Sequence, residues 1–302
     1  MKPAGFTYHR PATVDDAVAV LAEVGPAGKV LAGGQSLVPL LNMRLAAPEH
    51  LVDVNRLSDL AYVRADGDGV TVGALARHAD VERDEAAYAV LPLLRDTLRH
   101  VAHPTIRNRG TTVGSIAHAD PAGELTAVLA LLAGTVTLRS AAGERTVTAA
   151  DFFTGPMSTC AGAAELVTSV TFPVPEGRTG TVWTEVARRH GDYAVCGTGV
   201  VVTLDDDLRV AGARAAYVSV GPEPVVLDLT EAVAGEMHDA ADWPAAGRLA
   251  AGRLDPDDDI HATAAYRTRL AEVLTTRALR EAAGRAAGAT TAARREASGG
   301  DQ

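Results

Sequence analysis

Hydrophobic positions near the N-terminus follow a helical pattern. Four apolar residues recur at helical spacing: Val14, Ala17, Val18 and Leu21. Thr13 precedes them and can cap the helix, with Asp16 three residues later in a variant capping box. Gly25 can end the helix in a left-handed conformation. The chain is therefore expected to open with a capped amphipathic helix.

Two short apolar runs follow, at 29–31 and 51–54, and each is typical of a buried strand. The first run leads directly into the segment 32–36, which contains two glycines. The order helix, strand, loop, helix, strand predicts a small parallel α/β unit over roughly the first 55 residues.

The pattern then becomes that of an α+β unit. Hairpins are indicated around the turns at 66–69 and at Gly143, and a strand at 166–172 is stopped by Pro173. Helical stretches are expected near 77–85, 91–101 and 124–133, and the segment 103–123 is expected to be a loop.

A cluster of Pro and Gly at 173–180 indicates a domain boundary. Beyond it the pattern predicts three strands and two helices, at 181–188, 195–204, 208–220, about 244–250 and 263–285. We therefore expect a first domain at 1–176, with subdomains of about 1–57 and 58–176, and a second domain at 177–285. The remainder, 286–302, has the composition of a disordered tail.

Composition narrows the functional classes. The 302 residues carry a net charge of −10, which disfavours binding to nucleic acid. No apolar run approaches the ~20 residues that span a bilayer, and no secretory signal is seen, so a cytoplasmic location is expected. The two cysteines, Cys160 and Cys196, are too few for an iron–sulfur cluster and match no zinc spacing. If this chain transfers electrons onward, another polypeptide must receive them.

The first glycine-containing segment, A-G-G-Q-S-L at 32–37, follows a strand. Two glycines allow a sharp turn and a close approach to a ligand, and successive N–H groups can form an anion-binding nest. The segment lacks the Lys-Ser/Thr pair of a Walker loop and the third glycine of a Rossmann fingerprint. A phosphate site and a plain strand-to-helix turn both remain open on this segment alone.

The second segment, 103–124, is rich in hydroxyls, glycines and arginines and ends in acidic residues. It could hold phosphates through hydroxyls and amides, and a ribose or adenine through a carboxylate. Two other interpretations stay open. His118, Asp120 and Glu124 could ligate a metal, and Asp120 could simply cap a helix that begins at Pro121.

Three motifs taken together resemble the xanthine dehydrogenase and carbon monoxide dehydrogenase family, the molybdenum hydroxylases. They are A-G-G-Q-S-L-V-P-L at 32–40, I-R-N-R-G-T-T-V-G-S-I-A-H-A-D-P-A-G-E at 106–124, and R-R-H-G-D-Y-A at 188–194. The resemblance is to the FAD-binding medium subunit and spans roughly residues 4–280. It implies a two-subdomain FAD-binding fold of the PCMH type, followed by a domain with a three-stranded antiparallel sheet packed on helices.

The resemblance implies that 32–36 and 111–115 hold the FAD diphosphate, that Glu124 contacts the ribose or adenine, and that Tyr193 lies near the isoalloxazine. An ordinary buried strand tyrosine is the alternative for Tyr193. The full set of expected FAD-binding residues is Ala32, Gly33, Gly34, Gln35, Ser36, Leu37, Thr111, Thr112, Val113, Gly114, Ser115, His118, Asp120, Glu124 and Tyr193.

One position departs from the family pattern. Val113 stands where the family usually has a glycine, and Thr112 replaces the usual Ile. A β-branched residue disfavours positive φ, so FAD affinity is expected to fall if this position requires positive φ. If the glycine serves only a close approach, a slight shift of the segment is expected to keep FAD bound.

The resemblance implies an electron-transfer subunit. A partner with a molybdopterin centre would hydroxylate a small molecule, a second partner would carry iron–sulfur clusters, and FAD in this chain would reduce a small-molecule acceptor. No residue of this chain is expected to act as acid, base or nucleophile. The alternatives are a free-standing FAD-dependent oxidase or dehydrogenase and a scaffold that has lost FAD.

Overall fold

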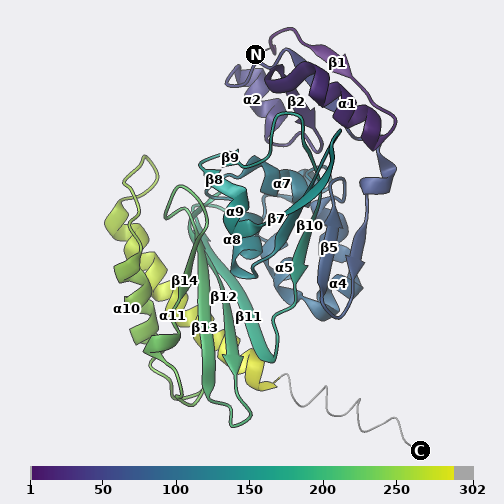
Figure 1. Cartoon of the computed structure of the whole chain (residues 1–302). Coiled ribbons are helices and arrows are strands. Elements are labelled where there is room, and N and C mark those ends of the chain that lie inside the picture. The colour runs from purple at the N-terminus through teal and green to yellow at the C-terminus, as the bar shows by residue number, and fades with distance from the viewer. Residues whose placement is uncertain (1, 289–302) are drawn as a thin grey trace, which may run out of the picture. The chain divides into compact units, whose positions relative to one another are not determined.

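The computed structural model describes residues 2–288, which form two compact units (Figure 1). Unit 1 comprises the chain up to Asp120 together with Ala133–Pro173, and unit 2 comprises Pro121–Leu132 together with the chain from Val174 onward. The sequence pattern placed the segment Pro121–Leu132 within the first domain, whereas by its contacts it groups with unit 2. Its apolar helix explains this, because that helix packs on the sheet of unit 2.

The first sheet of unit 1 is parallel. Its strands are β1 (Thr7–His9), β3 (His50–Asp53) and β2 (Gly28–Leu31), in that order across the sheet. Helices α1 (Val14–Val24) and α2 (Leu37–Met43) connect them. The predicted capping box is confirmed, because the Thr13 side chain accepts from the Asp16 N–H while the Asp16 side chain accepts from the Thr13 N–H. The parallel unit is also confirmed, with β1 as a strand that the pattern did not predict.

The second sheet of unit 1 has five antiparallel strands. Their order is β4 (Val63–Ala65), β5 (Gly69–Gly73), β10 (Leu166–Pro173), β6 (Thr135–Ser140) and β7 (Gly143–Thr148). Both predicted hairpins are present. Strand β10 is central in the sheet and mostly buried.

Short helices complete unit 1. They are α3 (His78–Arg83), α4 (Glu85–Val90), α5 (Pro92–Leu98), α6 (Pro104–Arg107), α7 (Thr112–His118) and α9 (Ala149–Phe152), with a small hairpin of β8 (Phe153–Gly155) and β9 (Ser158–Thr159). The prediction that 103–123 is a loop was wrong, because α6 and α7 lie within it. Pro104 occupies the first turn of α6 and Thr111 caps α7, and both are helix-start signals that the glycines obscured.

Unit 2 contains an antiparallel sheet of four strands, β11 (Arg178–Ala187), β12 (Ala194–Leu204), β13 (Val210–Val218) and β14 (Val225–Asp228). The three predicted strands are present, and β14 extends the sheet by a fourth that the pattern did not reveal. Its helices are α8 (Glu124–Leu131), α10 (Trp243–Arg253) and α11 (Ala264–Gly288). Helix α11 runs three residues past its predicted end, and the rest of the predicted tail lies outside the described residues.

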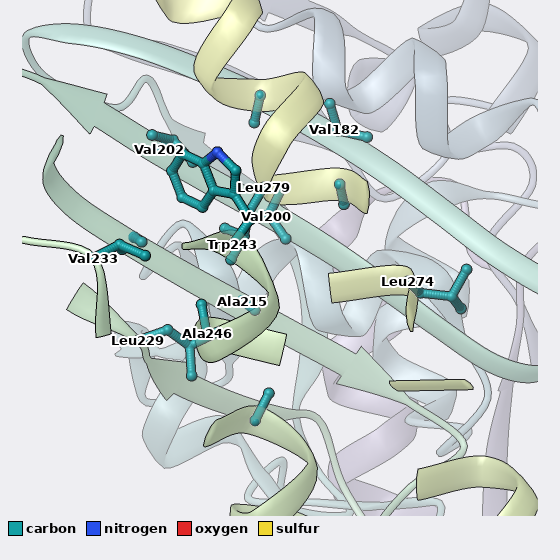
Figure 2. Close-up of a cluster of buried hydrophobic side chains, with 14 of the residues drawn as sticks. Val182, Val200, Val202, Ala215, Leu229, Val233, Trp243, Ala246, Leu274 and Leu279 are labelled. Carbon is teal, nitrogen blue, oxygen red and sulfur yellow. The ribbon is translucent and has the colours of Figure 1, made fainter. Parts of the chain in front are cut away.

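The core of unit 2 lies between the sheet and helices α10 and α11. Figure 2 shows Trp243 among the aliphatic side chains of this cluster, near Val200, Val202 and Leu279. Helix α11 approaches β11 closely at Gly180, where an added Cβ would lie 2.0 Å from the Ala282 carbonyl oxygen. Among residues 2–288, no helix has the length and apolar character needed to cross a membrane.

Candidate functional site

The first glycine segment leaves the carboxyl end of β2 and enters α2. Gly34 has φ +74°, a conformation that favours glycine. Gly33 is buried, and a Cβ added there would lie 2.5 Å from the Arg109 carbonyl oxygen and 2.7 Å from the Gly110 Cα. The backbones of the two glycine segments therefore touch at Gly33. The structure brings together two motifs that are about 75 residues apart in the sequence.

The second segment turns sharply between α6 and α7. Its backbone is held by the first residue of α3, because the His78 N–H donates to the Gly110 carbonyl at 2.9 Å. The Thr111 hydroxyl accepts from the Gly114 N–H at 3.1 Å and so caps α7. A Cβ at Gly114 would lie 2.4 Å from that hydroxyl oxygen. A glycine at position 114 therefore leaves room for the Thr111 hydroxyl that caps α7.

Val113 lies within the first turn of α7 and is 2% exposed. Its φ is not positive, so the condition under which FAD affinity was expected to fall is not met in this chain. The neighbouring Thr112 is also buried, with its hydroxyl 3.2 Å from His78 Nδ1. Val113 and Thr112 therefore contribute side chains to the core of unit 1.

A cavity of about 380 Å³ borders the first segment. It is lined by the backbone of residues 32–35, by the first turns of α2, and by Asp53, Asn55 and Arg109. The sequence analysis missed these last three. Asp53 is the final residue of β3 and pairs in register with Leu31 of β2, so both strands deliver polar groups to the same edge of the parallel sheet. The rule that ligands bind at the carboxyl ends of parallel strands could have found Asp53 and Asn55.

Hydrogen bonds fix the charge of Asp53. Burial acts to raise its pKa, but the hydrogen bonds donated by Tyr8 and Asn55 outweigh burial, and the net pKa is lowered. Asp53 is therefore ionised at neutral pH. Its two oxygens accept from the Tyr8 hydroxyl and from the Asn55 amide, which restrains its negative charge at the cavity.

Positive charge also converges on the cavity. Burial lowers the pKa of Arg77, and the nearby positive charge of Arg109 lowers it further. Within residues 2–288, Arg109 forms no ion pair, and it borders the cavity. Arg109 offers an anion in the cavity a positive partner, while the ionised Asp53 in the same lining opposes an anion placed close to it.

The other predicted residues of unit 1 lie around these two segments. Gln35 donates to the Gly33 carbonyl at 3.2 Å, and the Ser36 hydroxyl makes no capping bond to α2, whose first residue is Leu37. Ser115 lies in α7, His118 ends it, and Asp120 follows two residues later.

Both alternatives for the acidic end of the second motif can be assessed. Helix α8 begins at Glu124 with Gly123 as its N-cap, so the interpretation of Asp120 as an N-cap was wrong. The part of the chain that the structure describes holds no group of three His, Cys, Asp or Glu side chains placed to bind a metal ion.

Glu124 and Tyr193 belong to unit 2. Glu124 is 5% exposed at the start of α8, where the helix dipole favours a carboxylate. Tyr193 directly precedes β12 in the turn after β11 and is 61% exposed. The alternative of a buried strand tyrosine was therefore wrong. Folding leaves a large aromatic ring accessible at the third motif.

Two family profiles match the chain. One, described as the FAD binding domain in molybdopterin dehydrogenase, matches residues 4–175, and the other, the CO dehydrogenase flavoprotein C-terminal domain, matches residues 181–282. The chain belongs to the FAD-binding medium subunits of the molybdenum hydroxylase family. It is thus a flavoprotein oxidoreductase subunit with FAD as its cofactor.

Relatives match along nearly the whole chain. The caffeine dehydrogenase subunit beta of Pseudomonas sp. strain CBB1 is 38% identical, over 94% of this chain and 97% of its own length. The carbon monoxide dehydrogenase medium chain of Afipia carboxidovorans is 36% identical, over 95% of this chain and 99% of its own. A chain in the crystal structure of quinoline 2-oxidoreductase from Pseudomonas putida 86 superposes with a TM-score of 0.89 at 35% identity, over 95% of this chain and 99% of that chain.

The geometry of unit 1 fits the diphosphate of FAD. The contact at Gly33 leaves no room for a side chain, so the backbones of the two segments lie against each other next to the cavity that residues 32–35 and Arg109 line. Arg109 supplies a positive charge at the cavity. These features are those expected of a site for a doubly charged diphosphate.

Proposed function

We propose that residues 32–37 and 111–115, together with Arg109, hold the diphosphate of FAD in this chain. The observation that supports this proposal is the backbone contact at Gly33, next to a cavity lined by residues 32–35 and, from the second segment, by Arg109. His118 and Asp120, at the end of the second motif, complete the proposed set in unit 1. Glu124 is proposed to contact the ribose or adenine and Tyr193 the isoalloxazine, and the exposure of Tyr193 leaves its ring accessible for this.

The proposed role is electron transfer within a three-subunit molybdenum hydroxylase. A molybdopterin-binding large subunit would oxidise a small molecule, and an iron–sulfur small subunit would deliver the electrons to this chain. Bound FAD would supply the redox chemistry, because a flavin can accept electrons and pass them to an acceptor. The residues of this chain bind and orient the cofactor and shape access to it. With two cysteines, the chain depends on a partner for iron–sulfur clusters.

The hydroxylated substrate is decided by the partners under this proposal. The names of relatives refer to caffeine, carbon monoxide and quinoline, although their chains match this one at similar identity. This spread is expected if the medium subunit carries a shared redox task while the large subunit recognises the substrate. A cytoplasmic location and the division at about residue 176 also remain proposals.

Purification from the native host tests the assembly. A tagged copy of this chain is expected to bring with it molybdenum, iron and two further polypeptides, in fixed ratio to FAD. Yellow protein without molybdenum or iron would instead favour the free-standing flavoenzyme. Protein that stays colourless after titration with FAD would favour the scaffold.

A further inference from the structure

Asn55 and Arg77 form a polar bridge between the two glycine segments. The Asn55 amide nitrogen donates to the Ala32 carbonyl at 2.9 Å, in the first segment. One terminal nitrogen of Arg77 donates to the Arg109 carbonyl at 2.6 Å, in the second segment. The other donates to the Asn55 side-chain oxygen at 2.8 Å. A series of hydrogen bonds through the Asn55 and Arg77 side chains thus links the backbones of the two glycine segments.

The bridge ends at the point where the segments touch. The Arg109 carbonyl that accepts from Arg77 is the same group that lies 2.5 Å from a Cβ built on Gly33. Its orientation therefore decides how closely the first segment can approach the second. Loss of the Arg77 donor would remove a direct restraint on this carbonyl, although the neighbouring Gly110 carbonyl stays bonded to the His78 N–H.

Both members of the bridge are held from behind. Asp53 accepts from the Asn55 backbone N–H at 2.9 Å and from its amide nitrogen at 2.6 Å, which orients the amide. The Arg77 backbone donates to Asp80 at 2.9 Å and pairs as an isolated bridge with Thr111. Restraint of this kind keeps the two side chains in a single geometry before a ligand arrives.

We infer that Asn55 and Arg77 are positioning residues that set the spacing of the two glycine segments for the FAD diphosphate. The inference rests on the proposed FAD site. The bridge holds the backbones of residues 32–36 and 110–114 at one spacing, so that little ordering is left for FAD to impose. Arg77 acts through the Arg109 carbonyl and through Asn55, and its charge is secondary to its two-pronged geometry.

The test is a double-mutant cycle on the purified chain, read as the dissociation constant of FAD. Asn55→Ala and Arg77→Met are each expected to weaken FAD about tenfold, and the double variant about tenfold as well, because either change breaks the same bridge. Asn108→Ala and Arg83→Met are matched controls, because these exposed residues of unit 1 lie outside the bridge. Singles within twofold of wild type, or a double variant weakened about a hundredfold, would overturn the bridge.

Arg77→Lys separates geometry from charge. A lysine keeps the charge but has no planar fork to reach both acceptors, so it is expected to bind FAD as weakly as Arg77→Met. Full affinity in Arg77→Lys would show that charge alone matters and would refute the inference. If Arg77→Met does not fold, Asn55→Ala and Arg77→Lys carry the test.

A readout without cofactor distinguishes positioning from direct binding. Amide hydrogen exchange of the FAD-free protein is expected to speed up at 32–36 and 109–112 in Asn55→Ala and in Arg77→Met, and to stay unchanged in both controls. Unchanged exchange there would contradict preorganisation. Gly33→Ala tests the proposed FAD site separately from the bridge. If it leaves FAD affinity intact, the proposed site is wrong, whereas if it weakens FAD while the bridge variants do not, only the bridge is wrong.

Discussion

Replacing Gly33 by alanine perturbs the one point where the glycine segments meet. The new Cβ would lie 2.5 Å from the Arg109 carbonyl oxygen, 2.7 Å from the Gly110 Cα and 3.0 Å from the Thr111 nitrogen. All three are backbone atoms, so no flexible side chain can move aside. The segments must separate by several tenths of an ångström to accept the methyl group.

The cost of such overpacking is about 1–3 kcal/mol. Without ligand, the segments can separate only against the bridge of Asn55 and Arg77, so part of this cost should also appear as a lower free energy of unfolding. With FAD bound, both must return to their native spacing, and the strain then opposes binding. The expected loss of FAD affinity is therefore about 5- to 150-fold.

The assay is a titration of FAD-free protein with FAD, in which binding is measured as quenching of flavin fluorescence. The melting temperature of the same samples is measured in parallel. Gly67→Ala is the matched control, because an added Cβ there meets nothing within 4 Å. FAD affinity within twofold of wild type in Gly33→Ala, at unchanged melting temperature, would refute the placement of the diphosphate at this contact.

Three further changes test separate parts of the structure. Val113→Gly introduces the residue usual in the family. Because Val113 is a buried helical residue, this change should lower the free energy of unfolding by about 3 kcal/mol and leave FAD affinity within about twofold. A gain in FAD affinity would show that Val113 obstructs the cofactor. Burial, and secondarily the charge of Arg107, lowers the pKa of His78 to about 4. Between about pH 6.5 and pH 4 the unfolded chain therefore binds more protons than the folded chain. As the pH is lowered through this range, the free energy of unfolding should fall by up to about 3 kcal/mol. Urea unfolding at several pH values should show this fall in wild type and a flatter profile in His78→Gln, and equal profiles would contradict it. Arg267 is 5% exposed and donates to the Val195 carbonyl at 3.2 Å and to Asp259 at 2.8 Å. In urea unfolding, Arg267→Met should therefore lower the free energy of unfolding by about 3 kcal/mol, and Arg269→Met, which removes a surface ion pair, by less than about 1 kcal/mol. Equal losses in the two variants would contradict the role given to burial.

The sequence predicted those elements whose signals are local. The capping box at Thr13, the hairpins of unit 1 and the long strands of unit 2 depend on neighbouring residues, and all are present. Helices α6 and α7 were missed because glycines and hydroxyls are typical of loops, while the cap of α7 depends on one hydroxyl. Strands β1 and β14 are only three and four residues long, too short for periodicity to show.

The candidate site divides in the same way. Its glycine segments could be predicted because glycine clusters after a strand have a local meaning. Asn55 could have been found from its place just after a parallel strand, but Arg77 and Arg109 could not, because their importance lies in hydrogen bonds that span 22 residues or more. The position of Val113 shows the converse. A departure from a family pattern suggested strain, but the local helix places this side chain in the core.

Hydrogen exchange on the wild-type chain, with and without FAD, tests most directly whether both glycine segments grip the cofactor. Added FAD is expected to slow exchange at the amides of 32–36 and of 109–115 together, while the hairpin turn at 66–69 is unaffected. Slowing confined to only one segment, or absent from both while FAD is bound, would contradict the account.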